Sequence, residues 1–151
     1  MKIKLTNMCM IEKDDMVLVQ LREKKDWPGI TFPGGKVEKQ ESIYASCIRE
    51  VKEETGLDIK KLCFSGTIHY DVENGKEEWV IFLFKTNCFE GELLKESDEG
   101  KLYWMRKADL FLEDANLSND LDVYLKVYED PSIFEAYAKW MNNTSLDFKF
   151  Y

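Results

Sequence analysis

The sequence predicts an α+β fold in which helices pack on a mixed β-sheet. Segments with strand-like alternation and segments with helical spacing of apolar residues both occur along the chain. Two of the strand-like segments flank an Asn-Gly pair, which is typical of an antiparallel hairpin. Strands and helices do not alternate regularly, so we do not expect an all-parallel sheet.

The first third of the chain predicts three strands and a glycine-rich turn. Residues 3–11 alternate loosely and the apolar run 16–19 follows an acidic pair, which indicates two strands joined by a turn. Trp27-Pro28-Gly29 marks a loop before a short strand that ends at Phe32. The next segment, Pro33-Gly34-Gly35, can turn sharply and leave its own amides and carbonyls uncovered.

A helix is predicted from Glu41 to Thr55. Its apolar face is spaced by four, three and four residues, at Tyr44, Ile48, Val51 and Thr55. Gly56 follows as a C-cap. The hairpin comes next, with strands over 62–72 and 77–89 around Glu73-Asn74-Gly75-Lys76.

The last third predicts one more strand, two helices and a strand-like end. The strand covers 101–105, and the first helix, over 121–128, follows Asn119 as its cap. The second helix, over 133–141, follows Asp130-Pro131, a good N-cap and first-turn pair. Residues 146–151 alternate like a strand that docks on its own sheet or on a partner. The first option costs less entropy, so we favour a monomer over a homodimer.

The length, composition and net charge of the chain limit the classes of protein to which it can belong. The chain has 151 residues, of which 44% are hydrophobic, and no linker-like tract, so we expect a single domain over 1–151. A net charge of −8 argues against a basic platform and a stable nucleic acid complex. An acidic protein that handles phosphates needs cations to do so.

Cysteine and histidine usage excludes other classes. Four scattered cysteines without a C-x-x-C pair and the single His69 make a zinc or haem site improbable, and we expect the cysteines to act as small apolar residues. The start of the chain lacks the apolar run of a signal peptide, and no segment is long and apolar enough to span a membrane. We therefore expect a cytoplasmic protein with reduced thiols and no membrane partner.

Three glutamates crowd one face of the predicted 41–55 helix. At 100° per residue, Glu50, Glu53 and Glu54 fall within a sector of roughly 100°. Like charges at these spacings repel, and the helix C-terminus also disfavours anions. A hard divalent cation would reverse that penalty, because Mg²⁺ binds carboxylate and phosphate oxygens. The alternative is a solvated acidic face balanced by Arg49 and Lys52.

The segment around these glutamates resembles the Nudix box, G-x5-E-x7-R-E-U-x-E-E-x-G-U, in which U is a bulky aliphatic residue. Every defined position is filled, by Gly35, Glu41, Arg49, Glu50, Val51, Glu53, Glu54, Gly56 and Leu57. The resemblance implies a Nudix fold, an α/β/α sandwich around a mixed β-sheet. It also implies hydrolysis of a nucleoside diphosphate linked to another group, with Mg²⁺ as the cofactor and Mn²⁺ as its alternative.

The same resemblance assigns roles by position. Glu50, Glu53 and Glu54 match metal ligands, a backbone carbonyl in Gly34-Gly35 completes the set, and Glu50 is the candidate catalytic base. Arg49 is expected to hold a neighbouring carboxylate. Glu41 is either a structural anion or a supporting residue.

One more metal ligand is expected from the 95–100 loop. Many family members use a further acid there, and we choose Glu99, with Glu96 and Asp98 as alternatives. A polar surface loop without this role is the other interpretation.

Outside the box, the order of strand, Arg22, loop and Phe32-Pro-Gly-Gly resembles MutT-like nucleoside triphosphate diphosphatases. That resemblance implies that Arg22 meets the substrate and that Phe32 lines the base pocket. Asn119, with Asn116 and Asp120, is placed to contact a purine edge, although Asn119 also fits a helix cap.

Three tryptophans and the first hairpin strand offer further candidates for contact with the substrate. Trp27 fits a pocket rim, whereas Trp79 and Trp104 fit the core. Of His69 and Tyr70, strand alternation lets only one face the substrate.

The leading hypothesis is therefore metal-dependent hydrolysis of a nucleoside triphosphate, including an oxidised one such as 8-oxo-dGTP, to a nucleoside monophosphate and pyrophosphate. The alternative substrates are ADP-ribose, a dinucleoside polyphosphate or a capped RNA end. A different class is a non-catalytic module that senses a nucleotide, although such modules typically have degenerate boxes.

Overall fold

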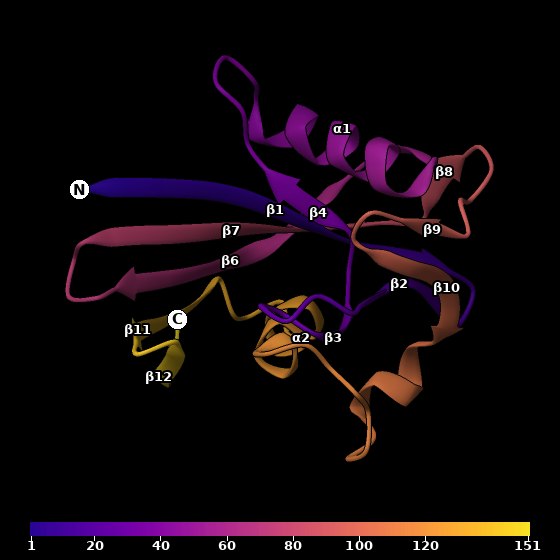
Figure 1. Ribbon diagram of the computed structural model, residues 1–151. Coiled ribbons are helices and arrows are strands. Elements are labelled where there is room, and N and C mark those ends of the chain that lie inside the picture. Colours follow the sequence, from indigo (N-terminus) through magenta and orange to yellow (C-terminus); the bar gives the residue numbers. More distant parts are fainter.

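The computed structural model describes residues 1–151, and Figure 1 shows its elements. The first half contains β1 (Lys2–Lys13), β2 (Met16–Arg22), β3 (Gly29–Thr31), β4 (Gly34–Lys36), α1 (Ile43–Thr55), β5 (Asp58–Lys60) and β6 (Cys63–Val72). The second half contains β7 (Glu77–Thr86), β8 (Cys88–Glu90), β9 (Glu96–Ser97), β10 (Gly100–Arg106), the 3-10 helix η1 (Lys107–Phe111), α2 (Leu121–Glu129), β11 (Glu135–Met141) and β12 (Thr144–Phe150).

The main sheet is mixed, as predicted. Its strands follow the order β12-β11-β6-β7-β1-β2-β10-β9, while β3 pairs with β2 and β4 with β1. β1 runs parallel to β7 and β11 runs parallel to β6, whereas the other pairs are antiparallel. β5 and β8 form a separate antiparallel pair.

Helices α1 and α2 lie on opposite sides of this sheet (Figure 1). Successive residues of β1 enter different cores, because side chains in a strand point alternately to its two faces. Cys9 and Ile11 pack in the cluster that contains Val51 of α1, while Met10 packs in the cluster that contains Leu125 of α2. The arrangement confirms the predicted α/β/α sandwich of the α+β class.

Local sequence explains where α1 begins and ends. The Ser42 side chain accepts a hydrogen bond from the Ala45 amide at 2.9 Å, so the helix starts two residues after the predicted Glu41. Gly56 adopts φ 82° and its amide donates to the Lys52 carbonyl, which confirms the predicted C-cap. Neither α1 nor α2 is long and apolar enough to cross a membrane.

The predicted helix over 133–141 is wrong. That segment contains strand β11, which pairs in parallel with β6 and antiparallel with β12. Ala136, Ala138 and Trp140 alternate toward the core, a period-two pattern that the helical spacing of the aromatic residues concealed. The strand-like end does dock on its own sheet, as β12.

Two further expectations need correction. Asn119 does not cap α2, because the N-cap is Asp120 in a left-handed conformation and it makes no side-chain capping bond. All four cysteines are free, and Cys9 and Cys47 are buried as expected of small apolar residues, but Cys63 is exposed and Cys88 half-buried.

Candidate active site

The glycine-rich turn is held between β1 and α1. In β4, Gly34 pairs with Met8 and Gly35 with Asn7. A Cβ on Gly34 would collide with the Asn7 backbone, so only glycine permits this approach. The buried Asn7 side chain accepts from the Gly35 amide at 3.3 Å and donates to Ser46 Oγ of α1 at 2.8 Å. Asn7 therefore joins the turn to the helix.

Two glutamates of α1 lie against this turn. The Glu50 carboxylate fills the space beside Gly35 in which a Cβ would stand. Glu54 accepts a hydrogen bond from the Gly34 amide at 3.2 Å. The Glu53 side chain is 59% exposed and extends farther into solvent.

Arg49 connects four groups around the turn. Its guanidinium donates two hydrogen bonds to Glu41, at 2.7 and 3.0 Å, in a bidentate pair. The remaining donors reach Glu50 at 3.0 Å, Glu53 at 3.2 Å and the Lys36 carbonyl at 2.9 Å. Arg49 thus fixes the orientation of Glu50 and binds α1 to the segment that follows β4.

The environments of Glu41, Glu50 and Glu54 shift the pKa values of their carboxyl groups in different directions. Burial raises the pKa of Glu54 to about 8, because the one amide bond from Gly34 offsets little of the lost hydration. Burial also raises the pKa of Glu50 above its usual value, against the opposing effect of Arg49. The hydrogen bonds from Arg49 lower the pKa of Glu41 to about 2. Glu41 is therefore ionised at neutral pH, while Glu54 without a bound cation is mostly protonated there and would ionise when a cation compensates its charge.

Among the loop acids, Glu99 lies near this group. Its carboxylate accepts from Arg22 at 3.0 Å and from Lys24 at 3.3 Å. Its charge contributes to the raised pKa of Glu54, whereas that of Arg22 opposes it. Glu96 and Asp98 line a surface hollow beside Glu99 but make no ion pair.

A cleft of about 260 Å³ opens beside Glu54 and brings several predicted residues together. Glu54, Gly34, Arg22, Phe32 and Trp27 all line it. Phe32 is only 2% exposed because Tyr128 of α2 packs edge-on against its ring. The cleft therefore joins acidic, basic and aromatic groups in one place.

Other predicted residues lie outside the cleft. Asn119 lines a neighbouring cavity, and the Asp120 carboxylate accepts hydrogen bonds from Tyr70 and Ser145. The Asn116 carbonyl accepts from the Ile30 amide. Neither His69 nor Tyr70, both in the first hairpin strand β6, lines the cleft. Tyr70 is buried in the core, and His69 packs on Tyr137 of β11.

The remaining tryptophans are only partly in the core. Trp79 and Trp104 are half-buried. Trp79 packs against the apolar cluster that contains Leu125 of α2, and Trp104 packs against the cluster that contains Val51 of α1. Trp27 lines both the cleft and the neighbouring cavity, as expected of a rim residue.

Sequence reasoning missed five polar residues of the cleft, namely Thr6, Asn7, Gln20, Thr31 and Tyr124. A signal for Asn7 exists, because it occupies the same face of β1 as the apolar Cys9 and Ile11. An amide in an otherwise buried stripe requires partners. No comparable signal marks Tyr124, whose position depends on how α2 packs.

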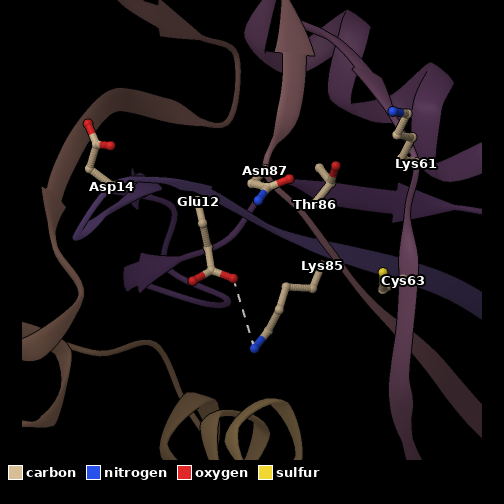
Figure 2. Close-up of a pocket in the computed structure, with 7 residues that line it drawn as sticks. All are labelled: Glu12, Asp14, Lys61, Cys63, Lys85, Thr86 and Asn87. Carbon is tan, nitrogen blue, oxygen red and sulfur yellow. Dashed lines mark ion pairs between the residues drawn. The ribbon is translucent and has the colours of Figure 1, made fainter.

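A separate cavity of about 430 Å³ lies between the end of β1 and the strands β6 and β7 (Figure 2). Lys61, Lys85, Glu12 and Asp14 balance one another in charge there, and Lys85 lies 3.9 Å from Glu12. This cavity shares no residue with the cleft, so it is not part of the candidate active site.

The residues around the turn fit a hard cation, although no three acidic, histidine or cysteine side chains converge as a ligand group. Glu50 and Glu53 turn toward Arg49, and Glu54 turns toward the Gly34 amide. Three observations support the fit: the poorly solvated carboxyl group of Glu54, the close approach of the Glu50 carboxylate to Gly35 and a donor set of oxygen atoms alone.

Comparisons with known proteins identify the family of the chain. The model of the NUDIX domain matches residues 4–127. The chain is 30% identical to a MutT protein of Bacillus halodurans, whose crystal structure superposes with a TM-score of 0.81 over 97% of both chains.

Curated relatives carry different names. The chain is 36% identical over 99 residues to the uncharacterised Nudix hydrolase YvcI of Bacillus subtilis, covering 64% of this chain and 61% of YvcI. It is 32% identical to the 8-oxo-dGTP diphosphatase of Buchnera aphidicola, over 72% of this chain and 77% of that protein. It is 29% identical to the ADP-ribose pyrophosphatase of Methanocaldococcus jannaschii, over 87% and 71%.

Proposed function

The chain belongs to the Nudix family, and from this premise we propose that it is a metal-dependent nucleoside triphosphate diphosphatase that releases a nucleoside monophosphate and pyrophosphate. Nudix hydrolases generally use divalent metals. The likeness to a MutT protein and to an 8-oxo-dGTP diphosphatase supports a triphosphate substrate, with oxidised purine nucleotides such as 8-oxo-dGTP as candidates.

The observation that carries the proposal is the position of Glu54. Its carboxylate is mostly buried, has one amide donor and lines the same cleft as Arg22 and Phe32. A buried carboxylate without a cation destabilises the fold, and such costs are typical of functional sites. A divalent cation would compensate this charge and would also bind the anionic phosphate chain of the substrate.

We assign the cation to Glu50, Glu53 and Glu54 with the Gly35 carbonyl, and Glu99 as the additional acid. A bound Mg²⁺ or Mn²⁺ supplies neutralisation of the phosphate charge and a lower pKa for an attacking water. Burial beside Gly35 raises the pKa of Glu50, which suits it to accept the proton of that water. Arg49 keeps the Glu50 carboxylate in position through its 3.0 Å hydrogen bond.

The substrate would lie along the cleft. Arg22 lines the cleft, where its guanidinium would meet the phosphates, and it also pairs with the Glu99 carboxylate. Phe32 and Trp27 supply aromatic surface for the nucleoside.

The test is product analysis of a panel of compounds incubated with Mg²⁺, in which chromatography follows the loss of each compound and a separate assay measures pyrophosphate and orthophosphate. The panel contains the four deoxynucleoside triphosphates, 8-oxo-dGTP, ADP-ribose, a dinucleoside polyphosphate and a capped RNA. We expect a triphosphate to give pyrophosphate and a monophosphate, and not orthophosphate. Turnover of ADP-ribose alone would favour the activity named for the archaeal relative. No turnover of any compound would favour a nucleotide sensor.

We also propose that residues 1–151 act as one domain and as a monomer. β11 extends the main sheet at the edge of β6, and β12 pairs with β11 of the same chain. Size-exclusion chromatography with light scattering tests the monomer.

A further inference from the structure

A second cavity adjoins the cleft at Trp27. It has a volume of about 490 Å³, within the range of ~300–1,000 Å³ that is typical of small-molecule sites. Its lining includes three tryptophans, Trp27, Trp79 and Trp140, and two amides, Asn119 and Asn143. Trp27 lines both the cleft and this cavity.

Part of this cavity comes from the end of the chain. Trp140 lies in β11 and Asn143 in the turn between β11 and β12, both beyond residue 127, where the family match ends. Parallel pairing of β11 with β6 places Trp140 opposite Val72. The C-terminal hairpin, residues 135–150, therefore forms one wall next to the candidate active site.

The hairpin holds Trp27 by stacking. The rings of Trp27 and Trp140 are 5.6 Å apart and tilted by only 10°, and Trp79 packs on Trp140 at 5.4 Å. The backbone of Trp27 is held as well, because Arg22 Nε donates a hydrogen bond to the Trp27 carbonyl at 3.1 Å. Trp27 is thus fixed between a residue of the cleft and a residue of the hairpin.

A second contact ties the hairpin to the cleft. Ser145 Oγ of β12 donates to Asp120 at 2.9 Å, and Tyr70 donates to the same carboxylate at 2.8 Å. The Tyr70 hydroxyl lies 2.9 Å from that of Tyr124, which lines the cleft. The hairpin therefore contacts Trp27 directly and is connected through Asp120 and Tyr70 to Tyr124 of α2, and both Trp27 and Tyr124 line the cleft.

We infer that the C-terminal hairpin is part of the substrate site, where Trp140 positions Trp27 and the Asn143 amide meets the edge of an aromatic base. The inference rests on the proposed function, because the base would belong to the nucleotide whose phosphates lie in the cleft. Indole rings offer stacking surface to any base, so they give affinity without identity. Amide side chains both donate and accept hydrogen bonds, so they discriminate between base edges.

The main test is Asn143→Gly, because Asn143 is exposed and has φ 61°, a conformation that glycine adopts without strain. We expect kcat/KM for the preferred triphosphate to fall about tenfold through KM, with kcat unchanged and less change for the other bases. Trp140→Phe should raise KM for all bases, because a smaller ring holds Trp27 less well. Lys149→Ala is the matched control, an exposed position on the same hairpin that lines neither cavity.

Binding of a nucleoside separates this inference from the proposed function. The 2′-deoxynucleosides that correspond to the triphosphates of the panel, which have no phosphate, are each titrated calorimetrically into the metal-free protein. We expect Asn143→Gly to weaken this binding about tenfold and Lys149→Ala to leave it unchanged.

The outcomes are distinct. Hydrolysis with the same base preference and the same nucleoside affinity in Asn143→Gly and Trp140→Phe would overturn the inference and leave the proposed function intact. If no compound is hydrolysed, the proposed function fails, and the nucleoside titration still decides. Selective weakening in Asn143→Gly would then support a base site at the hairpin, whereas unchanged or absent binding would overturn it.

Discussion

The Glu50 carboxylate occupies the space that a side chain at position 35 would need. This contact between a helix residue and a turn residue explains why the chain has glycine there. The same contact makes the position of the Glu50 carboxylate sensitive to a single methyl group.

Gly35→Ala should therefore displace Glu50. We expect kcat to fall about 10²-fold, because a misplacement of about 1 Å in a catalytic group has effects of that size. Pyrophosphate release measures the loss. Lys36→Ala, an exposed neighbour in β4, is the control and should keep its activity. Full activity in Gly35→Ala would refute the tight approach.

Glu54→Gln should lower the rate at least ~10²-fold, since metal stabilisation of developing charge is worth several kcal/mol. The amide cannot ionise, so above pH 8, where the half-buried Glu54 carboxyl would carry a charge, the metal-free variant should unfold at a temperature no lower than the wild type. Pyrophosphate release measures the rate, and scanning calorimetry above pH 8 with and without Mn²⁺ measures the unfolding temperature. Stabilisation by Mn²⁺ that persists in the variant would contradict the ligand assignment.

Arg49→Lys keeps the charge but loses the planar fork that binds Glu41 in two hydrogen bonds. Residues that orient metal ligands typically contribute 10- to 100-fold, and we expect a loss in this range. Steady-state kinetics over a series of Mg²⁺ concentrations measures it. A rate equal to that of the wild type would show that Arg49 serves stability alone.

Glu99→Gln should have a smaller effect, about tenfold, because the Glu99 side chain is 30% exposed and is neutralised by Arg22 and Lys24. The comparison with Glu96→Gln and Asp98→Asn under the same conditions tests the choice of loop acid. A larger loss of rate in Glu96→Gln or Asp98→Asn than in Glu99→Gln would assign the loop metal ligand to that residue instead.

The pairing of Glu41 with Arg49 predicts a dependence of stability on pH. The pKa of Glu41 is lowered from 4.5 to about 2 in the folded protein. Its contribution is therefore fully present above pH 4.5 and is lost as the pH falls toward 2. Urea unfolding of the wild type and of Glu41→Gln should show a difference that is constant near neutral pH and shrinks in this window. A difference that does not change with pH would contradict the ion pair.

The C-terminal hairpin marks the limit of prediction from local patterns. Ile133, Phe134, Tyr137 and Trp140 fit a helical period, yet the segment forms β11. The open edge of β6 offers backbone hydrogen bonds from a strand distant in sequence, and local spacing carries no information about that edge.

Helix α1, its Gly56 cap, the Asn-Gly hairpin and the acidic face of the Nudix box could all be predicted from the sequence. Each of these depends on neighbours within a few residues, through helical period, turn chemistry or motif spacing. Three contacts could be seen only in the folded protein: Asn7 joins the turn to α1, Glu99 pairs with Arg22 and Trp140 stacks on Trp27. Those contacts join residues far apart in the chain, so they exist only once the sheet and its two helical layers have formed.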